Sequence, residues 1–146
     1  MNRIAEITVN YSTYIKKDDR HKITSSREAE THFRAVWSDS MEHIEEMYLM
    51  LLNRSNEVLG YTKISMGGIN ATLCDPKVIF QVALKGNASG ILLAHNHPSG
   101  ALKPSEQDIR LTKKIKEGAG LLDMGFLDHI ILSKEGCFSF ADDGLI

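Results

Sequence analysis

Residues 90–108 read GILLAHNHPSGALKPSEQD, and this stretch decides the architecture. Its apolar run at residues 91–94 is short and follows a glycine, which is typical of a central strand. Side chains on a strand alternate between two faces, so His95 and His97 point the same way while Asn96 points elsewhere. We therefore expect two imidazoles at the end of a strand, close enough to share one ion.

The chain that follows brings a carboxylate back to the two histidines. Pro98 and Gly100 predict a sharp turn, and a helix that begins near Ser105 carries Asp108 in its first turn. Two neutral imidazoles and one carboxylate suit zinc and leave a fourth position for water. Ser-x-x-Asp before a helix is also close to a capping box, and the helix dipole favours an anion in the first turn. Both interpretations of Ser105 and Asp108 stay open on spacing alone.

The remaining sequence predicts an α/β (α+β) domain with a mixed central sheet flanked by helices. Strands are expected at residues 4–14 (half-buried), 46–53, 58–65, 91–94, 128–133 and 137–140, and helices from about 25, from 75 to 86, and from 105 to about 117. A charged connector over residues 16–23 is expected to be a solvated loop. We expect residues 1–25 to form this first strand and connector, and residues 26–146 to form the domain.

Composition narrows the class of protein. The 146 residues suit one domain, and the formal charge of −2 argues against a protein wrapped in nucleic acid, without excluding a local basic patch. Cys74 and Cys137 form no CxxC pair, as is typical of thiols in a reducing cytosol. The N-terminus has no apolar signal region, and the longest aliphatic or aromatic run, residues 47–52, is far shorter than the roughly 20 residues of a membrane span. We expect a cytoplasmic protein without a membrane segment.

Several blocks together resemble a known family. The pattern His-x-His, ten residues that begin with Pro, then Asp, with Ser three residues before that Asp, is similar to the signature of the JAMM metalloproteases (JAB1/MPN domains), and His95, His97, Ser105 and Asp108 match it. GGINATLCDPKVIFQVALKGNASGILLAHNHPSG and LLDMGFLDHIILSKEGCFSFADDGLI resemble the RadC branch of that superfamily. The likeness runs from about residue 26 to the C-terminus and implies the cytidine-deaminase-like JAB1/MPN fold.

The resemblance also implies a general base and one departure from the family. The family places a glutamate at the start of an early strand, and counting back from Val58 selects Glu45; Glu46, on the opposite strand face, is expected to be a solvated charge. RadC proteins usually carry an N-terminal helical region that resembles helix-hairpin-helix modules. We expect this region to be absent here, since about 25 residues precede the domain, and this puts a DNA role in doubt.

The implied chemistry is zinc-dependent hydrolysis of a peptide or isopeptide bond. Zinc held by His95, His97 and Asp108 would lower the pKa of water toward about 7, Glu45 would move the proton to the leaving amine, and Ser105 would donate a hydrogen bond to the oxyanion. The alternative is a non-catalytic, metal-containing interaction module in DNA repair or with mobile DNA. We expect a peptide or protein substrate and little DNA binding at physiological salt.

Three further residues have two interpretations each. Asn70 could orient a substrate or be a turn residue, and the turn is favoured. Asp128 and His129 open a late strand, where they could support a ligand histidine or form a satisfied strand-end pair. The strand-end pair is favoured.

Overall fold

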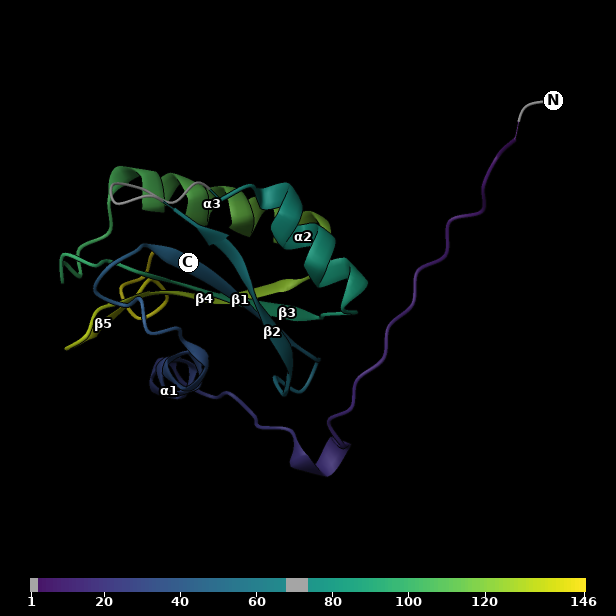
Figure 1. Cartoon of the computed structure of the whole chain (residues 1–146), viewed down its shortest axis with the longest axis horizontal. Coiled ribbons are helices and arrows are strands. Elements are labelled where there is room, and N and C mark those ends of the chain that lie inside the picture. The colour runs from purple at the N-terminus through teal and green to yellow at the C-terminus, as the bar shows by residue number, and fades with distance from the viewer. Residues whose placement is uncertain (1–2, 68–73) are drawn as a thin grey trace.

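A computed structural model describes residues 3–67 and 74–146 and has helices on both faces of one sheet (Figure 1). The elements in chain order are η1 (Lys17–Asp19), α1 (Ser26–Val36), β1 (Glu46–Leu52), β2 (Val58–Met66), α2 (Pro76–Lys85), β3 (Gly90–Asn96), α3 (Glu106–Leu121), β4 (Gly125–Leu132) and β5 (Cys137–Ser139). The strand order is β2-β1-β3-β4-β5. The mixed α/β fold is therefore confirmed, and so is the predicted element order after its first strand.

The sheet is mixed because β3 has an antiparallel neighbour on one side and a parallel neighbour on the other. β1 runs antiparallel to both β2 and β3, β3 runs parallel to β4, and β4 runs antiparallel to β5. Every residue of β1 and β3 is buried, as their continuous apolar sequences predict. These two strands consequently form the middle of the domain.

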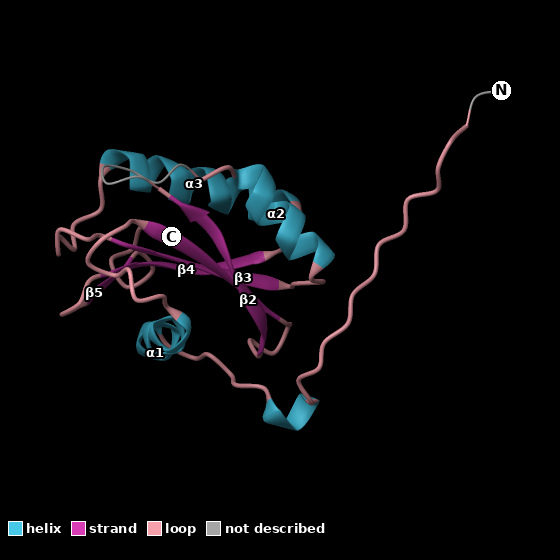
Figure 2. Cartoon of the chain, in the orientation of Figure 1, coloured by secondary structure: helices cyan, strands magenta, loops and turns pink. Residues whose placement is uncertain are grey.

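Each face of the sheet has its own apolar cluster. Helix α1 covers one face, where Phe33 packs with alternate residues of β1, β3 and β4 such as Tyr48 and Leu92. Helices α2 and α3 cover the other face, where Ile79 and Ile115 pack with the intervening residues of the same strands. Figure 2 shows this three-layer arrangement, with the sheet between α1 and the α2–α3 pair. Polar groups at the sheet's end therefore point toward different helices on its two faces.

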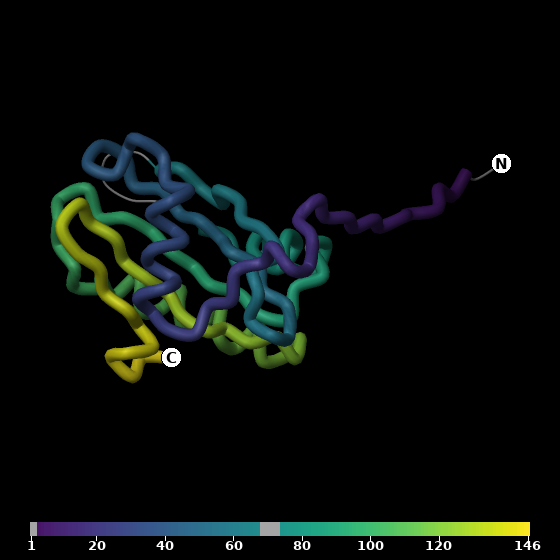
Figure 3. The backbone as a smooth tube through the Cα atoms, turned by 90° about the horizontal axis from the view of Figure 1, so that it is seen from below, coloured from purple at the N-terminus to yellow at the C-terminus, as the bar shows by residue number. Residues whose placement is uncertain are grey.

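The half-buried strand predicted over residues 4–14 is wrong. Residues 3–14 form no strand, and Ile4 and Ile7 are 94% and 89% exposed. This segment extends away from the body of the domain (Figure 3). Alternating sequence can only suggest a buried face, whereas a strand also needs a neighbour for its backbone groups. The boundary at residue 25 stays a prediction.

The connector is also more ordered than the predicted solvated loop. Its last residue, Ile23, is 4% exposed and belongs to the cluster under α1. Its backbone N–H donates to Asn56 O, and Val58 N–H donates to His21 O, so residues 21–23 lie along the β1–β2 turn. The charged residues that precede Ile23 led to the prediction of a solvated loop, because one buried apolar residue gives little signal in such a segment.

Helix α3 ends at Leu121, four residues beyond the predicted end at Glu117, and runs through two glycines. A Cβ on Gly118 would lie 2.6 Å from Phe80 Cε2 of α2, so this glycine permits close contact of the two helices. A Cβ on Gly120 would meet no atom within 4 Å. Packing against α2 thus outweighs the low helix propensity that suggested an earlier end.

The two glycines of α3 form a matched pair for a stability measurement. We expect Gly120→Ala to raise the free energy of unfolding by about 0.5 kcal/mol, because alanine restricts the unfolded chain without steric cost. Gly118→Ala should give no gain or a loss of about 1 kcal/mol, because Phe80 must move. Urea unfolding of both variants tests this, and equal gains would contradict the close contact.

Candidate metal centre

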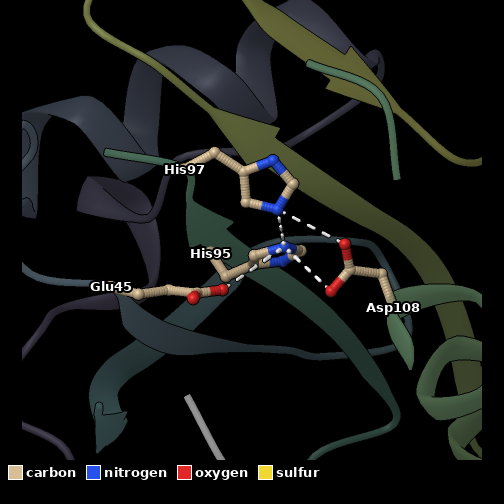
Figure 4. Close-up of side chains that lie close together, drawn as sticks. All are labelled: Glu45, His95, His97 and Asp108. Carbon is tan, nitrogen blue, oxygen red and sulfur yellow. Dashed lines mark hydrogen bonds and ion pairs between the residues drawn. The ribbon is translucent and has the colours of Figure 1, made fainter. Parts of the chain in front are cut away.

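Four side chains converge at the end of β3. Glu45, His95, His97 and Asp108 each offer one ligand atom, and these atoms all lie within 4.8 Å of one another. In Figure 4 the carboxylates of Glu45 and Asp108 approach His95 from opposite sides, with His97 completing the group. All four residues named from the sequence as ligands or base thus lie in one cluster of the described chain.

Strand pairing explains how residues 50 positions apart meet. Because β1 is antiparallel to β3, the start of β1 lies beside the end of β3, with Met47 opposite His95. Glu45 immediately precedes β1. His97 continues the β3–β4 pairing by one residue, since its N–H donates to Leu132 O over 2.9 Å. The backbone therefore fixes both imidazoles and the approach of Glu45.

The distances suit a tetrahedral ion. Two donors about 2.0–2.1 Å from zinc at the tetrahedral angle stand about 3.3 Å apart. The Nε2 atoms of His95 and His97 are 3.0 Å apart, His95 Nε2 is 3.3 Å from Asp108 Oδ1, and His97 Nε2 is 3.3 Å from Asp108 Oδ2. His97 Nδ1 lies 2.7 Å from Ala101 O; a carbonyl only accepts, so Nδ1 carries a proton. The neutral His97 ring then offers a bare Nε2 to the cluster.

Asp108 takes part in both arrangements that the sequence left open. Its Oδ2 accepts from Ser105 N–H over 2.8 Å, and Ser105 Oγ accepts from Asp108 N–H over 3.1 Å, which is a complete capping box. The same carboxylate faces both histidines. Burial opposes its ionisation, but hydrogen bonds from His95 and His97 outweigh burial and hold the pKa of Asp108 well below its usual range. The cap therefore aims an ionised carboxylate at the imidazoles.

Ser105 lies at the helix start and is exposed. Its Oγ accepts the capping hydrogen bond, and its own O–H finds no acceptor among residues 3–67 and 74–146. The hydroxyl proton remains available to a ligand. The proposed catalytic role of Ser105 stays a prediction.

Glu46 is not the solvated charge that we expected. It is fully buried, and its carboxylate accepts from Ser38 Oγ over 2.6 Å and pairs with Lys63 Nζ at 2.6 Å. Burial opposes ionisation, but Lys63 and Ser38 outweigh it and lower the pKa of Glu46. Glu46 lies with Tyr48 on the face of β1 that α1 covers, and its partners are on that face rather than in the four-residue cluster. A strand buried on both faces leaves no solvated position at this end.

Asn96, between the two candidate ligand histidines, anchors the turn that carries Glu45. It is fully buried on the opposite face of β3; its Oδ1 accepts from Glu46 N–H over 2.7 Å, and its Nδ2 donates to Met41 O and Ile44 O over 2.7 and 2.9 Å. These backbone groups flank Glu45. The sequence interpretation missed this role, although a polar residue inside a buried strand signals a partner to be found.

The favoured pairing of Asp128 with His129 at a strand end is wrong for His129. Asp128 is satisfied locally, by Ser139 Oγ and two backbone N–H groups. The His129 ring instead lies behind His95, with His129 Nε2 2.7 Å from His95 Nδ1 and His129 Nδ1 2.6 Å from Thr112 Oγ1. His129 is fully buried, and burial lowers its pKa far below the usual value. It supports a candidate ligand as a neutral imidazole.

The remaining candidates from the sequence are Asn70 and the two cysteines, and neither cysteine belongs to the cluster. Asn70 falls outside the described residues. Cys74 and Cys137 are both half-buried free thiols, and burial raises their pKa values to about 12 and about 11. Neither joins the four-residue group among the described residues. Within the same residues, no helix is long and apolar enough to span a bilayer.

The fold and the cluster together define a mixed α/β domain with a possible metal site of two histidines and two carboxylates. The family model of the RadC-like JAB domain matches residues 23–145. The chain belongs to this family.

The chain is also similar to UPF0758 proteins that are longer than it is. It is 41% identical over 124 residues to a UPF0758 protein of Flavobacterium johnsoniae. The aligned residues make up 85% of this chain and 53% of that protein. The UPF0758 protein of Porphyromonas gingivalis is 42% identical over 128 residues, or 87% and 56% of the two chains. That of Pelodictyon phaeoclathratiforme is 32% identical over 146 residues, or 100% and 65%. The chain thus spans roughly half to two thirds of the length of these relatives.

Metal binding should weaken with acidity. The hydrogen bond to Asp108 raises the pKa of His97 despite opposing burial, so in the metal-free chain a proton occupies His97 Nε2 at higher pH than usual. A metal ion must displace that proton. We expect zinc affinity, measured by chelator competition, to fall about tenfold per unit as the pH drops below the raised pKa of His97. A flat profile from about pH 8 to about 6 would contradict the assignment of His97 as a ligand.

Asn96 should stabilise the turn before β1. Asn96→Ala leaves a buried N–H and two carbonyl groups unpaired, so we expect a loss of about 2–4 kcal/mol in the free energy of unfolding. Amide exchange should rise selectively at residues 41–46. Asn96→Asp, which keeps an acceptor but places a charge against two carbonyl groups, should be at least as destabilising. Variants with wild-type exchange at residues 41–46 would show that the turn does not depend on Asn96.

Proposed function

We propose that this domain is a zinc-dependent metallohydrolase that cleaves a peptide or isopeptide bond with water. One observation carries the proposal: two imidazoles and one carboxylate face a common point at tetrahedral spacings, and a second carboxylate lies beside them. Two histidines, one carboxylate and an open position form a typical catalytic zinc site. The match to the RadC-like JAB domain supports the same chemistry.

The residues present fit zinc by donor type and by spacing. His95, His97 and Asp108 would hold the ion. Bound zinc supplies Lewis acidity, which lowers the pKa of water to about 7 and polarises a carbonyl. A pair of bare Nε2 atoms 3.0 Å apart repel each other, so a proton occupies this position in the metal-free chain and a metal ion would take its place.

Glu45 is the proposed general base. Its Oε1 lies 4.0 Å from His95 Nε2, farther than either histidine–Asp108 contact. This offset places the carboxylate beside the ligand set, within reach of a water molecule there, where it can take the water proton and transfer it to the leaving amine. The hydrogen bonds of Asn96 hold the backbone on both sides of Glu45. The proposed base is thus held by β3, the strand that carries His95 and leads directly into His97.

Ser105 is the proposed oxyanion donor. Its hydroxyl accepts from Asp108 N–H, which leaves the O–H to point outward at the exposed helix start. A donor fixed at that point stabilises negative charge that develops on the carbonyl oxygen. The substrate is proposed to be a peptide or a protein, and a net charge of −2 gives no electrostatic support to nucleic acid.

The general base can be tested separately from the metal site. We expect Glu45→Gln to retain zinc but to lose about 10²–10⁴-fold in the hydrolysis rate, because the amide cannot accept the proton. Glu42→Gln, at an exposed carboxylate three residues away, is the matched control and should hydrolyse like the wild type. The assay uses the zinc-loaded chain with a fluorogenic peptide library and with lysine-isopeptide-linked peptides.

The outcome also separates the alternative function. If wild type and Glu45→Gln carry equal zinc and neither cleaves any substrate of both sets, the hydrolase proposal fails and a metal-containing interaction module remains. A salt-dependent shift of DNA in a gel would then assign that module to nucleic acid, since phosphate contacts weaken as salt rises.

A further inference from the structure

His129 is a buried imidazole to which the proposed hydrolysis gives no task. It lies on β4, on the sheet face that α2 and α3 cover, and its ring stacks on Phe140 with centroids 4.7 Å apart. Both ring nitrogens are used: Nε2 faces His95 Nδ1 at 2.7 Å, and Nδ1 faces Thr112 Oγ1 at 2.6 Å. The direction of these two hydrogen bonds follows from a third.

The Thr112 hydroxyl sets the direction. Its Oγ1 lies 2.8 Å from the backbone oxygen of Asp108, and a carbonyl can only accept, so Thr112 donates its single proton there. Thr112 Oγ1 is then an acceptor toward His129. His129 must therefore carry its proton on Nδ1 and donate it to Thr112.

The chain of hydrogen bonds then reaches His95. A fully buried imidazole whose nitrogens contact a hydroxyl and a second imidazole is neutral, so protonation at His129 Nδ1 leaves Nε2 bare. His95 must donate to that lone pair, which puts the proton of His95 on Nδ1. In the neutral His95 ring, Nε2 is then the nitrogen without a proton, and this is the atom that faces His97 and Asp108.

We propose that His129 and Thr112 are positioning residues that lock His95 in its Nδ1–H tautomer and so keep Nε2 bare for the metal ion. The network begins and ends at Asp108. Asp108 accepts the Thr112 hydrogen bond through its backbone and faces His95 through its carboxylate at 3.3 Å. Two candidate ligands, His95 on β3 and Asp108 on α3, are thus connected through His129 on β4.

The first test uses the metal-free chain and rests only on the hydrogen-bond network. Nitrogen-15 NMR of the histidine rings should show His95 protonated at Nδ1 and His129 also protonated at Nδ1. Thr112→Val removes the acceptor for His129 with little change in shape, so His129 should lose its preference for Nδ1–H and His95 should follow. An Nε2–H His95 in the wild type, or an unchanged pair of tautomers in Thr112→Val, would overturn the proposal.

The second test measures zinc affinity and rests on the metal-binding part of the proposed function. We expect His129→Phe, which keeps a stacked ring without nitrogens, to weaken zinc binding about 10–100-fold, as loss of a ligand's hydrogen-bond partner typically does. His129→Gln, whose Oε1 can accept from His95, should restore most of the affinity, and Thr112→Val should show a loss. Ile115→Val, one turn further along the same face of α3, controls for a changed core and should bind like the wild type.

These outcomes separate this proposal from the hydrolase proposal. Equal zinc affinity in wild type, His129→Phe and Thr112→Val would overturn the positioning role, as would equal losses in His129→Phe and His129→Gln. Should His129→Phe fail to fold, Thr112→Val and the ring tautomers still decide the matter. A chain that shows the expected tautomers and affinities but cleaves no peptide supports the positioning role and contradicts hydrolysis alone.

Discussion

The position of β3 between an antiparallel and a parallel neighbour is the constraint on which the candidate site depends. The antiparallel pairing with β1 brings the residue before β1 to the end of β3, and the parallel pairing with β4 places His129 on the same face as His95. Because β3 is buried along its whole length, its last residues cannot rearrange without breaking both pairings. A flexible loop with the same residues would not hold four ligand atoms within 4.8 Å.

The two faces of β3 carry different tasks at this end. On one face, His95 points toward α3 and meets Asp108; on the other, Asn96 points toward the turn before β1 and holds its backbone. One strand therefore fixes candidate ligands and candidate base through alternating side chains. The buried side chains of Glu46, Asn96 and His129 are tolerated at this end of the sheet because each has partners, as Glu46 has with Ser38 and Lys63.

The elements and the cluster could be predicted because their signals are local or nearly so. The apolar runs of β1 and β3, the Asp75 cap of α2 and the alternation of His95 with His97 are all readable within a few residues. Glu45 needed the family resemblance, since two adjacent glutamates are indistinguishable by composition. Local signals also misled: alternation at residues 4–14 predicted a strand that has no partner, and glycines predicted an early end to α3, which extends because of Phe80.

The roles of the supporting residues could not be decided from the sequence, which offered support of a histidine only as the less favoured interpretation of His129, because their partners are distant in sequence. Asn96 bonds to a backbone 50 residues earlier, and His129 lies 34 residues after His95. Hydrogen-bond direction adds a second obstacle. The proposed tautomer of His95 depends on the backbone oxygen of Asp108, which fixes the proton of Thr112 and, through Thr112, the proton of His129. A histidine that is a strand-end residue in sequence becomes a ligand support only once three elements are in place. The tautomer proposed for His95 is thus a property of the assembled sheet and helix rather than of the His-Asn-His stretch alone.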